Sequence, residues 1–159
     1  MRFGIGYDVH RLAPEHKLIL GGVEVPSEQG LIGWSDADVL THAIIDALLG
    51  AAALGDIGKY FPPGDPQYKN ISSLLLLEQV RDMLAKKGWR VINIDATIVA
   101  ERPKLRDYVD EMCCNLSRSI GIKEDCVNVK ASTSEQLGFA GREEGMVAWA
   151  VASISKENE

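Results

Sequence analysis

The sequence predicts a layered fold of the α/β or α+β class, in a single domain spanning residues 1–159. Segments with the two-residue periodicity of strands alternate along the chain with segments of helical periodicity. The length of 159 residues is typical of one domain, and no linker or internal repeat divides it. A hydrophobic content of 46% and a charged content of 25% are ordinary for a folded protein. Disordered, collagen-like and coiled-coil architectures are therefore excluded.

The N-terminal third of the chain is expected to hold two strands, a loop and a long helix. These elements are expected at residues 2–10, 17–25, 30–35 and 36–54. The pair Gly21-Gly22 interrupts the second strand and predicts a hairpin there. Gly55 follows the helix in the position of a C′ glycine, which predicts the helix end.

The rest of the chain is expected to hold an irregular connection, two helices and three strands. In chain order they are expected at residues 58–70, 72–87, 92–100, 103–116, 126–131 and 146–154. Ser72 or Ser73 is a suitable N-cap for the first of these helices, and Lys86-Lys87-Gly88 a suitable end. Pro103 is expected to open the next helix, because proline is favoured in the first helical turn.

The segment Val39–Leu54 is apolar on most sides of the predicted helix. A helix of this kind must be buried all round. Contact with another copy of the chain is the favoured explanation, and a position at the centre of the domain is the alternative. The last strand, Met146–Ile154, is apolar on both faces, so it must also be buried on both faces.

Charge and cysteine usage limit the partners and the compartment. The 17 basic and 23 acidic residues give a net charge of −6, which argues against nucleic acid or an anionic membrane as the main partner. No apolar run approaches the about 20 residues of a membrane helix, and no signal peptide is recognisable. The three cysteines lack CxxC spacing, which indicates free thiols and a cytoplasmic location.

Asp8, His10 and His42 are the candidates for a metal site. Asp8 and His10 lie two apart on the first strand, so their side chains leave the same face. Asp38, His42 and Asp46 form a polar stripe on the apolar helix, and burying them would require a neutralising cation or a polar substrate. One carboxylate and two imidazoles with a fourth position open would be a catalytic zinc pattern. The alternative is that the stripe is a solvated face.

Polar groups also gather where strands end. The run Ser132-Thr133-Ser134-Glu135 follows a strand and suits phosphate oxygens and Mg²⁺, but it is equally a capping box that could start a helix. Arg102, Lys104 and Arg106 make a basic cluster beyond another strand. The tight turn Gly55-Asp56-Ile57-Gly58 offers backbone amides and one carboxylate, although such turns are common.

Four stretches resemble signatures of the 2-C-methyl-D-erythritol 2,4-cyclodiphosphate synthase family, in order and over essentially the whole chain. They are residues 6–10 (GYDVH), 35–39 (SDADV), 48–58 (LLGAAALGDIG) and 138–142 (GFAGR). The resemblance implies a chorismate-mutase-like domain, with a mixed β-sheet packed against helices on one side, that forms a homotrimer with active sites between subunits. It also implies a metal-dependent phosphorus–oxygen lyase of the non-mevalonate isoprenoid pathway. Such an enzyme cyclises 4-diphosphocytidyl-2-C-methyl-D-erythritol 2-phosphate and releases CMP.

The resemblance also implies roles for individual residues. One Zn²⁺ per subunit would be held by Asp8, His10 and His42, and Glu135 would position Mg²⁺ or Mn²⁺ on the substrate diphosphate. Thr133 would steady the transition state. The residues implied to bind substrate are Asp8, Val9, His10, Trp34, Ser35, Asp56, Ile57, Gly58, Phe61, Asp65, Ala100, Lys104, Leu105, Arg106, Ala131, Ser132, Thr133, Ser134, Glu135, Phe139 and Arg142.

The chain departs from the family pattern at three places. Trp34 occupies the position of a histidine that assists at the transition state, and an indole cannot carry that positive charge. Pro63 stands where an aspartate is common, and Ser132 and Ser134 replace threonines. Trp34 keeps open a rival hypothesis, a catalytically impaired trimer that binds isoprenoid diphosphates in an axial cavity. A metal-dependent phosphohydrolase is a third.

Overall fold

Seven strands and five α-helices make up the computed structural model, which describes residues 1–156. The last three residues of the expected 1–159 domain lie outside that range. The strands are β1 (Arg2–Pro14), β2 (Leu18–Leu20), β3 (Val23–Val25), β4 (Gln29–Leu31), β5 (Trp89–Val99), β6 (Val127–Ser132) and β7 (Gly145–Lys156). The helices are α1 (Val39–Ala51), α2 (Ile57–Tyr60), α3 (Ser73–Lys86), α4 (Val109–Ile120) and α5 (Gly138–Gly141).

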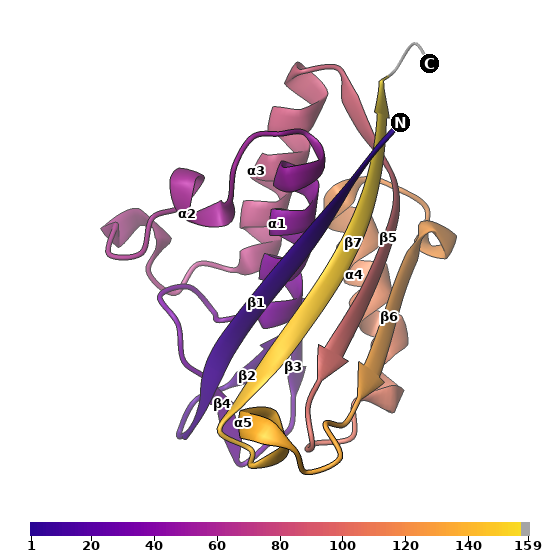
Figure 1. Cartoon of the computed structure of the whole chain (residues 1–159). Coiled ribbons are helices and arrows are strands. Elements are labelled where there is room, and N and C mark those ends of the chain that lie inside the picture. Colours follow the sequence, from indigo (N-terminus) through magenta and orange to yellow (C-terminus); the bar gives the residue numbers. More distant parts are fainter. Residues whose placement is uncertain (157–159) are drawn as a thin grey trace.

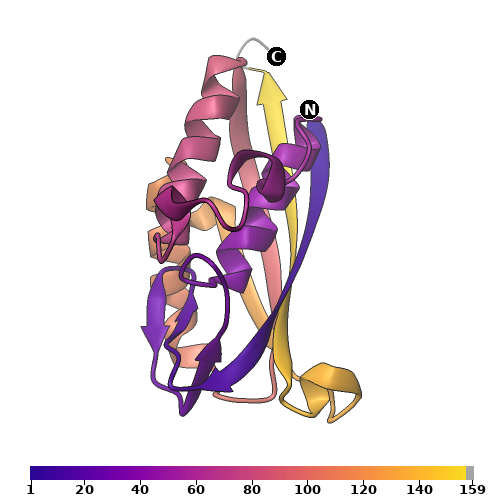
Figure 2. The same ribbon diagram turned by 90° about the vertical axis from the view of Figure 1, so that its left-hand side faces the viewer.

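A five-stranded mixed sheet forms one layer, and α1, α3 and α4 cover one of its faces (Figures 1 and 2). The strand order is β4-β1-β7-β5-β6; β5 and β6 run parallel and the other neighbours antiparallel. This architecture confirms the predicted fold class. Beside the sheet, β2 and β3 form the predicted hairpin, in which Gly21 and Gly22 adopt positive φ angles of 56° and 72°.

Some boundaries differ from the prediction. A short edge strand, β4, lies inside the segment expected to be a loop. Helix α1 begins at Val39, because Asp38 acts as its N-cap and accepts a hydrogen bond from Thr41 N. Helix α4 begins at Val109, since the residues after Pro103 form an irregular segment and one 3₁₀ turn instead of helix.

Helix α1 is buried on all sides within the single chain, between β1 and β7 on one side and α3 on another. The explanation of its apolar surface by another copy is therefore wrong, and the alternative of a central core helix is confirmed. Glycines on β1 permit the close approach: a Cβ at Gly6 would lie 1.8 Å from the carbonyl oxygen of Ala43. A Cβ at Gly4 would lie 2.0 Å from that of Ala47.

The other face of the sheet carries large apolar side chains that α1, α3 and α4 leave uncovered, and we call it the open face; the short helix α5 lies against one end of it. Its exposed side chains on β1 and β7 are Phe3, Ile5, Tyr7, Val9, Trp149 and Val151. Strand β7 thus buries one side against α1 and leaves the other accessible. Contacts within one chain therefore account for the apolar residues on its helix-facing side but not for those on the open face. Within residues 1–156, no helix is both long and apolar enough to cross a membrane.

Candidate functional site

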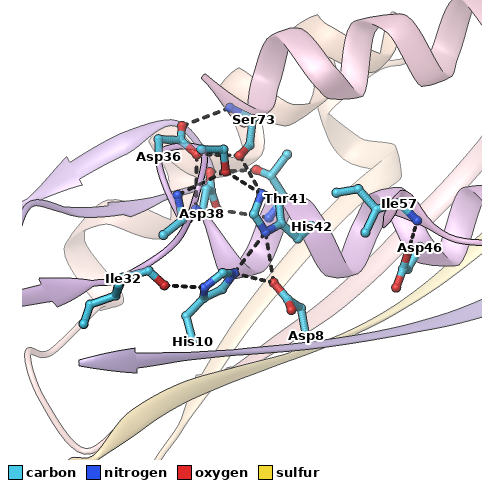
Figure 3. A network of polar contacts seen from close by, with 12 residues as sticks. Asp8, His10, Ile32, Asp36, Asp38, Thr41, His42, Asp46, Ile57 and Ser73 are labelled. Carbon is cyan, nitrogen blue, oxygen red and sulfur yellow. Dashed lines mark hydrogen bonds and ion pairs between the residues drawn. The ribbon is translucent and has the colours of Figure 1, made fainter. Parts of the chain in front are cut away.

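Asp8, His10 and His42 bring three ligand atoms together where β1 passes beneath the first turn of α1 (Figure 3). Asp8 Oδ2 lies 2.9 Å from His10 Nε2 and 3.0 Å from His42 Nδ1. The two imidazole nitrogens are 3.1 Å apart. The structure therefore joins the three residues that the sequence singled out, from segments more than thirty residues apart.

The donor set fits a divalent cation. Nδ1 of His10 faces the carbonyl oxygen of Ile32 at 2.7 Å, and a carbonyl can only accept, so in the neutral ring Nε2 offers a lone pair to the cluster. Separations of 2.9–3.1 Å are slightly below the roughly 3.3 Å expected between ligand atoms about 2.0–2.1 Å from a tetrahedral zinc. The group can thus hold zinc with little rearrangement and leaves a fourth position open.

Without a cation the cluster behaves as an ion pair. Burial alone would raise the pKa of Asp8, but hydrogen bonds and charges from both histidines lower it to about 2. Burial alone would lower the pKa of His10, yet the hydrogen bond and charge of Asp8 raise that pKa above its usual value. A bound cation would have to displace the proton from His10.

A cavity of about 180 Å³ adjoins the three ligands, and we call it the metal pocket. Its lining residues are Asp8, His10, Trp34, Ser35, His42, Ile57, Gly58, Phe61, Pro63, Tyr68 and Leu76. Most of the substrate residues expected between positions 8 and 61 therefore surround one space. Tyr68 and Leu76 were missed, because only the folding of the 58–70 connection and α3 onto α1 brings them there.

Trp34 fastens the 58–70 connection over this pocket. Its Nε1 donates to the carbonyl oxygen of Asp65 at 2.8 Å, and its own carbonyl accepts from Asn70 N at 2.8 Å. The ammonium of Lys69 lies 5.9 Å from the centre of the indole ring. The indole thus holds the loop in place, a task that needs a donor but no positive charge.

A larger cavity, of about 730 Å³, lies at the carboxyl ends of β5 and β6, and we call it the strand-end pocket. It is lined by Ala100, Glu101, Pro103, Lys104, Leu105, Arg106, Val109, Asp110, Val129, Lys130, Ala131, Ser132 and Thr133. The two segments expected to bind the nucleotide, residues 100–106 and 131–133, thus line the same cavity. Lys130 also lines the cavity, but its ammonium forms an ion pair with Asp95, so the positive charge of this pocket comes from Lys104 and Arg106.

The turn after β6 is held without a helix, so the capping-box alternative for residues 132–135 is wrong. Glu135 and Gln136 adopt positive φ angles of 50° and 61°, which no helix permits. The carboxylate of Glu101 accepts hydrogen bonds from the N–H groups of Ser134 and Gln136. Thr133 donates its hydroxyl to Glu135 at 3.1 Å, and the Glu135 carboxylate remains exposed.

Seven expected site residues lie outside both pockets, and two of them, Ser134 and Glu135, belong to the turn after β6. Val9 points from β1 to the open face, opposite to Asp8. Asp56 caps α2, and the carboxylate of Asp65 accepts hydrogen bonds from Gln67. Phe139 borders a cavity of about 280 Å³ on the open face, lined also by Tyr7 and Trp149 from the strands. Arg142 forms an ion pair with Glu144.

The metal pocket and the strand-end pocket do not meet within one chain. They share no lining residue. Their strands β1 and β6 are separated by β7 and β5, which is three strand spacings or roughly 14 Å. Asp8 and His10 point to the helix-covered face, whereas Ser134, beside Glu135, borders a cavity on the open face with Tyr7 and Trp149.

Comparison with known proteins gives consistent matches. A model described as the YgbB family matches residues 1–155. A protein of Dehalococcoides mccartyi (strain CBDB1) named 2-C-methyl-D-erythritol 2,4-cyclodiphosphate synthase is 70% identical over 157 residues, covering 99% of this chain and 100% of its own.

Solved structures agree. The bifunctional IspDF of Campylobacter jejuni superposes with a TM-score of 0.94 and 41% identity, covering 98% of this chain but 42% of that longer one. A CDP complex of IspF from Plasmodium falciparum has a TM-score of 0.86 and 31% identity, covering 99% of this chain and 97% of that one.

Proposed function

This chain belongs to the YgbB family, and on that premise we propose that it is a 2-C-methyl-D-erythritol 2,4-cyclodiphosphate synthase. It would close 4-diphosphocytidyl-2-C-methyl-D-erythritol 2-phosphate into the cyclic diphosphate and release CMP, as a phosphorus–oxygen lyase of isoprenoid precursor synthesis. The observation that carries the proposal is the full-length identity of 70% to a protein of that name.

The reaction requires the 2-phosphate to be aligned with the phosphorus it attacks, and the negative charge of the diphosphate to be neutralised. The attacking 2-phosphate is already anionic and belongs to the same molecule as the phosphorus it attacks, so no strong base is required. Asp8, His10 and His42 would hold Zn²⁺, and Glu135 would hold Mg²⁺ or Mn²⁺. These cations would neutralise the diphosphate oxygens as charge shifts toward the leaving CMP. Ser35 and the turn at Ile57-Gly58 would orient the methylerythritol part beside the metal pocket.

The strand-end pocket would take the cytidine and its phosphates. Lys104 and Arg106 supply positive charge there, and the ends of β5 and β6 line the same cavity. Thr133 lies at its rim, where its hydroxyl would contact the diphosphate. A structural relative bound to CDP, with 31% identity to this chain, supports the assignment of a nucleotide to this fold.

We further propose a homotrimer in which neighbouring copies complete each other's sites. The two pockets of one chain share no lining residue, and the strands β1 and β6 that carry them lie roughly 14 Å apart, so a second copy would bring its strand-end pocket to the metal pocket. The open face supplies an apolar surface for this contact. Phe139 and Arg142 would lie toward the trimer axis, where an isoprenoid diphosphate could occupy an axial cavity. The unpaired thiols of Cys113, Cys114 and Cys126 support a cytoplasmic location.

Phosphorus NMR of a single reaction tests the proposal. Purified zinc-loaded protein is mixed with the diphosphocytidyl substrate and Mg²⁺, and we expect CMP and the cyclic diphosphate in equal amounts. A linear monophosphate product would instead identify a phosphohydrolase. Absence of turnover, together with binding of an isoprenoid diphosphate, would identify the impaired trimer. Sedimentation velocity on the same sample tests the trimer, and a monomer at assay concentration would contradict it.

A further inference from the structure

His42 has a second ring nitrogen, Nε2, at the end of a hydrogen-bond chain that the roles above leave unused. This nitrogen lies 2.8 Å from Oγ of Ser73, the first residue of α3. The Ser73 hydroxyl in turn forms a short hydrogen bond with Oδ1 of Asp36. Figure 3 shows Asp36 and Ser73 above His42, and Ser73 is completely buried.

The direction of each proton in this chain follows from Asp36. Its carboxylate faces only donors: the backbone N–H groups of Ser73 at 2.9 Å and Asp38 at 3.2 Å, and the hydroxyl of Ser73. Because a carboxylate accepts, the Ser73 proton points to Asp36. The Ser73 oxygen is then left to accept from Nε2–H of His42. In a neutral ring with Nε2–H, Nδ1 carries the lone pair that a cation would take, whereas without a cation the Asp8 carboxylate, 3.0 Å from Nδ1, favours a proton there.

We propose that Ser73 and Asp36 are positioning residues that favour the Nε2–H tautomer of His42 and aim Nδ1 at the cation. The inference rests on the proposed function only in assuming that the cluster takes a divalent cation. Partners of this kind orient metal-binding histidines and raise their basicity, and losing one typically costs 10- to 100-fold in metal affinity.

Ser35 is a second possible hydrogen-bond partner of Nε2, but its contacts do not fix the direction of its own hydroxyl proton. Its Oγ lies 3.1 Å from Nε2 of His42. Its other contact is the backbone N–H of Ala37, at 3.3 Å, which is also a donor. Nothing in these contacts forces the Ser35 proton away from His42, whereas Asp36 forces that of Ser73.

The Asp36 carboxylate does more than cap a helix. Ser72 makes no side-chain cap for α3, so Oδ2 of Asp36 caps this helix from a distant part of the chain. A cap requires one oxygen, and the second oxygen binds the Ser73 hydroxyl. The carboxylate thereby connects the segment before α1, the N-terminus of α3 and the metal ligand on α1.

Zinc affinity provides the first test. Dissociation constants are measured by competition with a chromophoric chelator for wild type, Ser73→Ala, Asp36→Asn and the double variant. We expect a 10- to 100-fold loss in each single variant, and a double variant no weaker than the weaker single, because both act through one chain. Ser117→Ala is the matched control: Ser117 is also a buried helical serine, but its hydroxyl donates to Cys114 O, and its affinity should not change.

The tautomer of His42 provides a second test that needs neither metal nor activity. In zinc-free protein at alkaline pH, Asp8 favours a proton on Nδ1 and Ser73 favours one on Nε2, so two-bond ¹H–¹⁵N correlation spectra report the balance between them. The Nε2–H fraction should be the same in wild type and in Ser117→Ala, and smaller in Ser73→Ala. A purely structural role for Ser73 would lower stability without changing the tautomer.

Two results would overturn the inference. One is a Ser73→Ala variant with wild-type zinc affinity and the wild-type fraction of the Nε2–H tautomer. The other is a larger loss in Ser35→Ala than in Ser73→Ala, which would make Ser35 the controlling acceptor. A wild type that binds no zinc but shows the expected tautomers would contradict the proposed metal dependence and leave the hydrogen-bond chain supported.

Discussion

The metal pocket and the strand-end pocket are built in opposite ways. The three ligands of the metal pocket are at least partly buried, and backbone or side-chain partners orient them within the same chain. The strand-end pocket is wide, and the side chains of Lys104 and Arg106 are exposed at its edge. The folding of one chain already holds the side chains of the metal pocket in place, whereas the strand-end pocket is open to solvent and to a ligand or a second copy of the chain.

This difference predicts how each pocket responds to change. Substitutions in the metal pocket should affect cation retention, and with it activity, because one chain supplies every ligand. Substitutions in the strand-end pocket should affect nucleotide affinity and leave the cation in place.

The largest expected effect comes from His42→Ala. Zinc should be lost on gel filtration, and kcat should fall about 10³-fold or more, since several kcal/mol of charge stabilisation disappear. Metal analysis and phosphorus NMR measure the two quantities. His16→Ala, which removes an exposed histidine outside both pockets, is the control. A His42→Ala protein with full zinc content would refute the ligand assignment.

Gly6→Ala tests whether the close contact of β1 with α1 creates the metal pocket. The new Cβ would lie 1.8 Å from Ala43 O, so the helix must move, and stability should fall by about 1–3 kcal/mol or more together with zinc affinity. Gly50→Ala is the control, because its Cβ would meet only Ile5 O at 3.8 Å, and it should gain about 0.5–1 kcal/mol. Urea unfolding and chelator competition check both. Equal stability of Gly6→Ala and wild type would show that the contact is not needed.

Lys104→Ala tests the independence of the strand-end pocket. Loss of one charge-assisted hydrogen bond, worth about 1.5–3 kcal/mol, should weaken CDP binding about 10- to 100-fold. Calorimetric titration measures it, and metal analysis should find the zinc content unchanged. Loss of zinc from Lys104→Ala would mean that the two pockets are coupled.

The smallest effect concerns pH. Asp8 holds the pKa of His10 above 6.5, so a proton competes with the cation there. Zinc affinity should fall as the pH drops below that pKa, by at most about tenfold per pH unit for this group. The same profile is expected in Lys104→Ala, and chelator competition at several pH values records both. A flat profile from about pH 8 to 5.5 would exclude His10 as a ligand.

Periodicity predicted the residues of the metal pocket but not the contact that unites them. The two-residue spacing placed Asp8 and His10 on one face, and the polar stripe singled out His42. Two members of that stripe are structural: Asp38 accepts hydrogen bonds from the hairpin turn, and Asp46 accepts one from Ile57 N. A carboxylate on a helix gives no sign of whether a cation or a backbone N–H will satisfy it.

The sequence also misled where close packing depends on glycines, which have no side chain. Helix α1 was assigned to an oligomer contact because glycines on a facing strand leave no hydrophobic pattern to recognise. Strand β4 was missed because three residues around Gly30 are too short to show alternation. The position of residues 100–106 and 131–133 after strand ends predicted the strand-end pocket, yet only the three-dimensional strand order shows that it is separate from the metal pocket.

Strand β1 alternates two functions along one backbone. Its even-numbered residues, Gly4 and Gly6 and then Asp8 and His10, first admit the helix and then supply ligands, while the odd-numbered residues between them form the open face. An insertion or deletion of one residue here would exchange the two sets and lose both surfaces at once. This strand can therefore change by substitution but not by insertion or deletion. A substitution at an even-numbered position alters the helix-facing surface alone, and one at an odd-numbered position alters the open face alone.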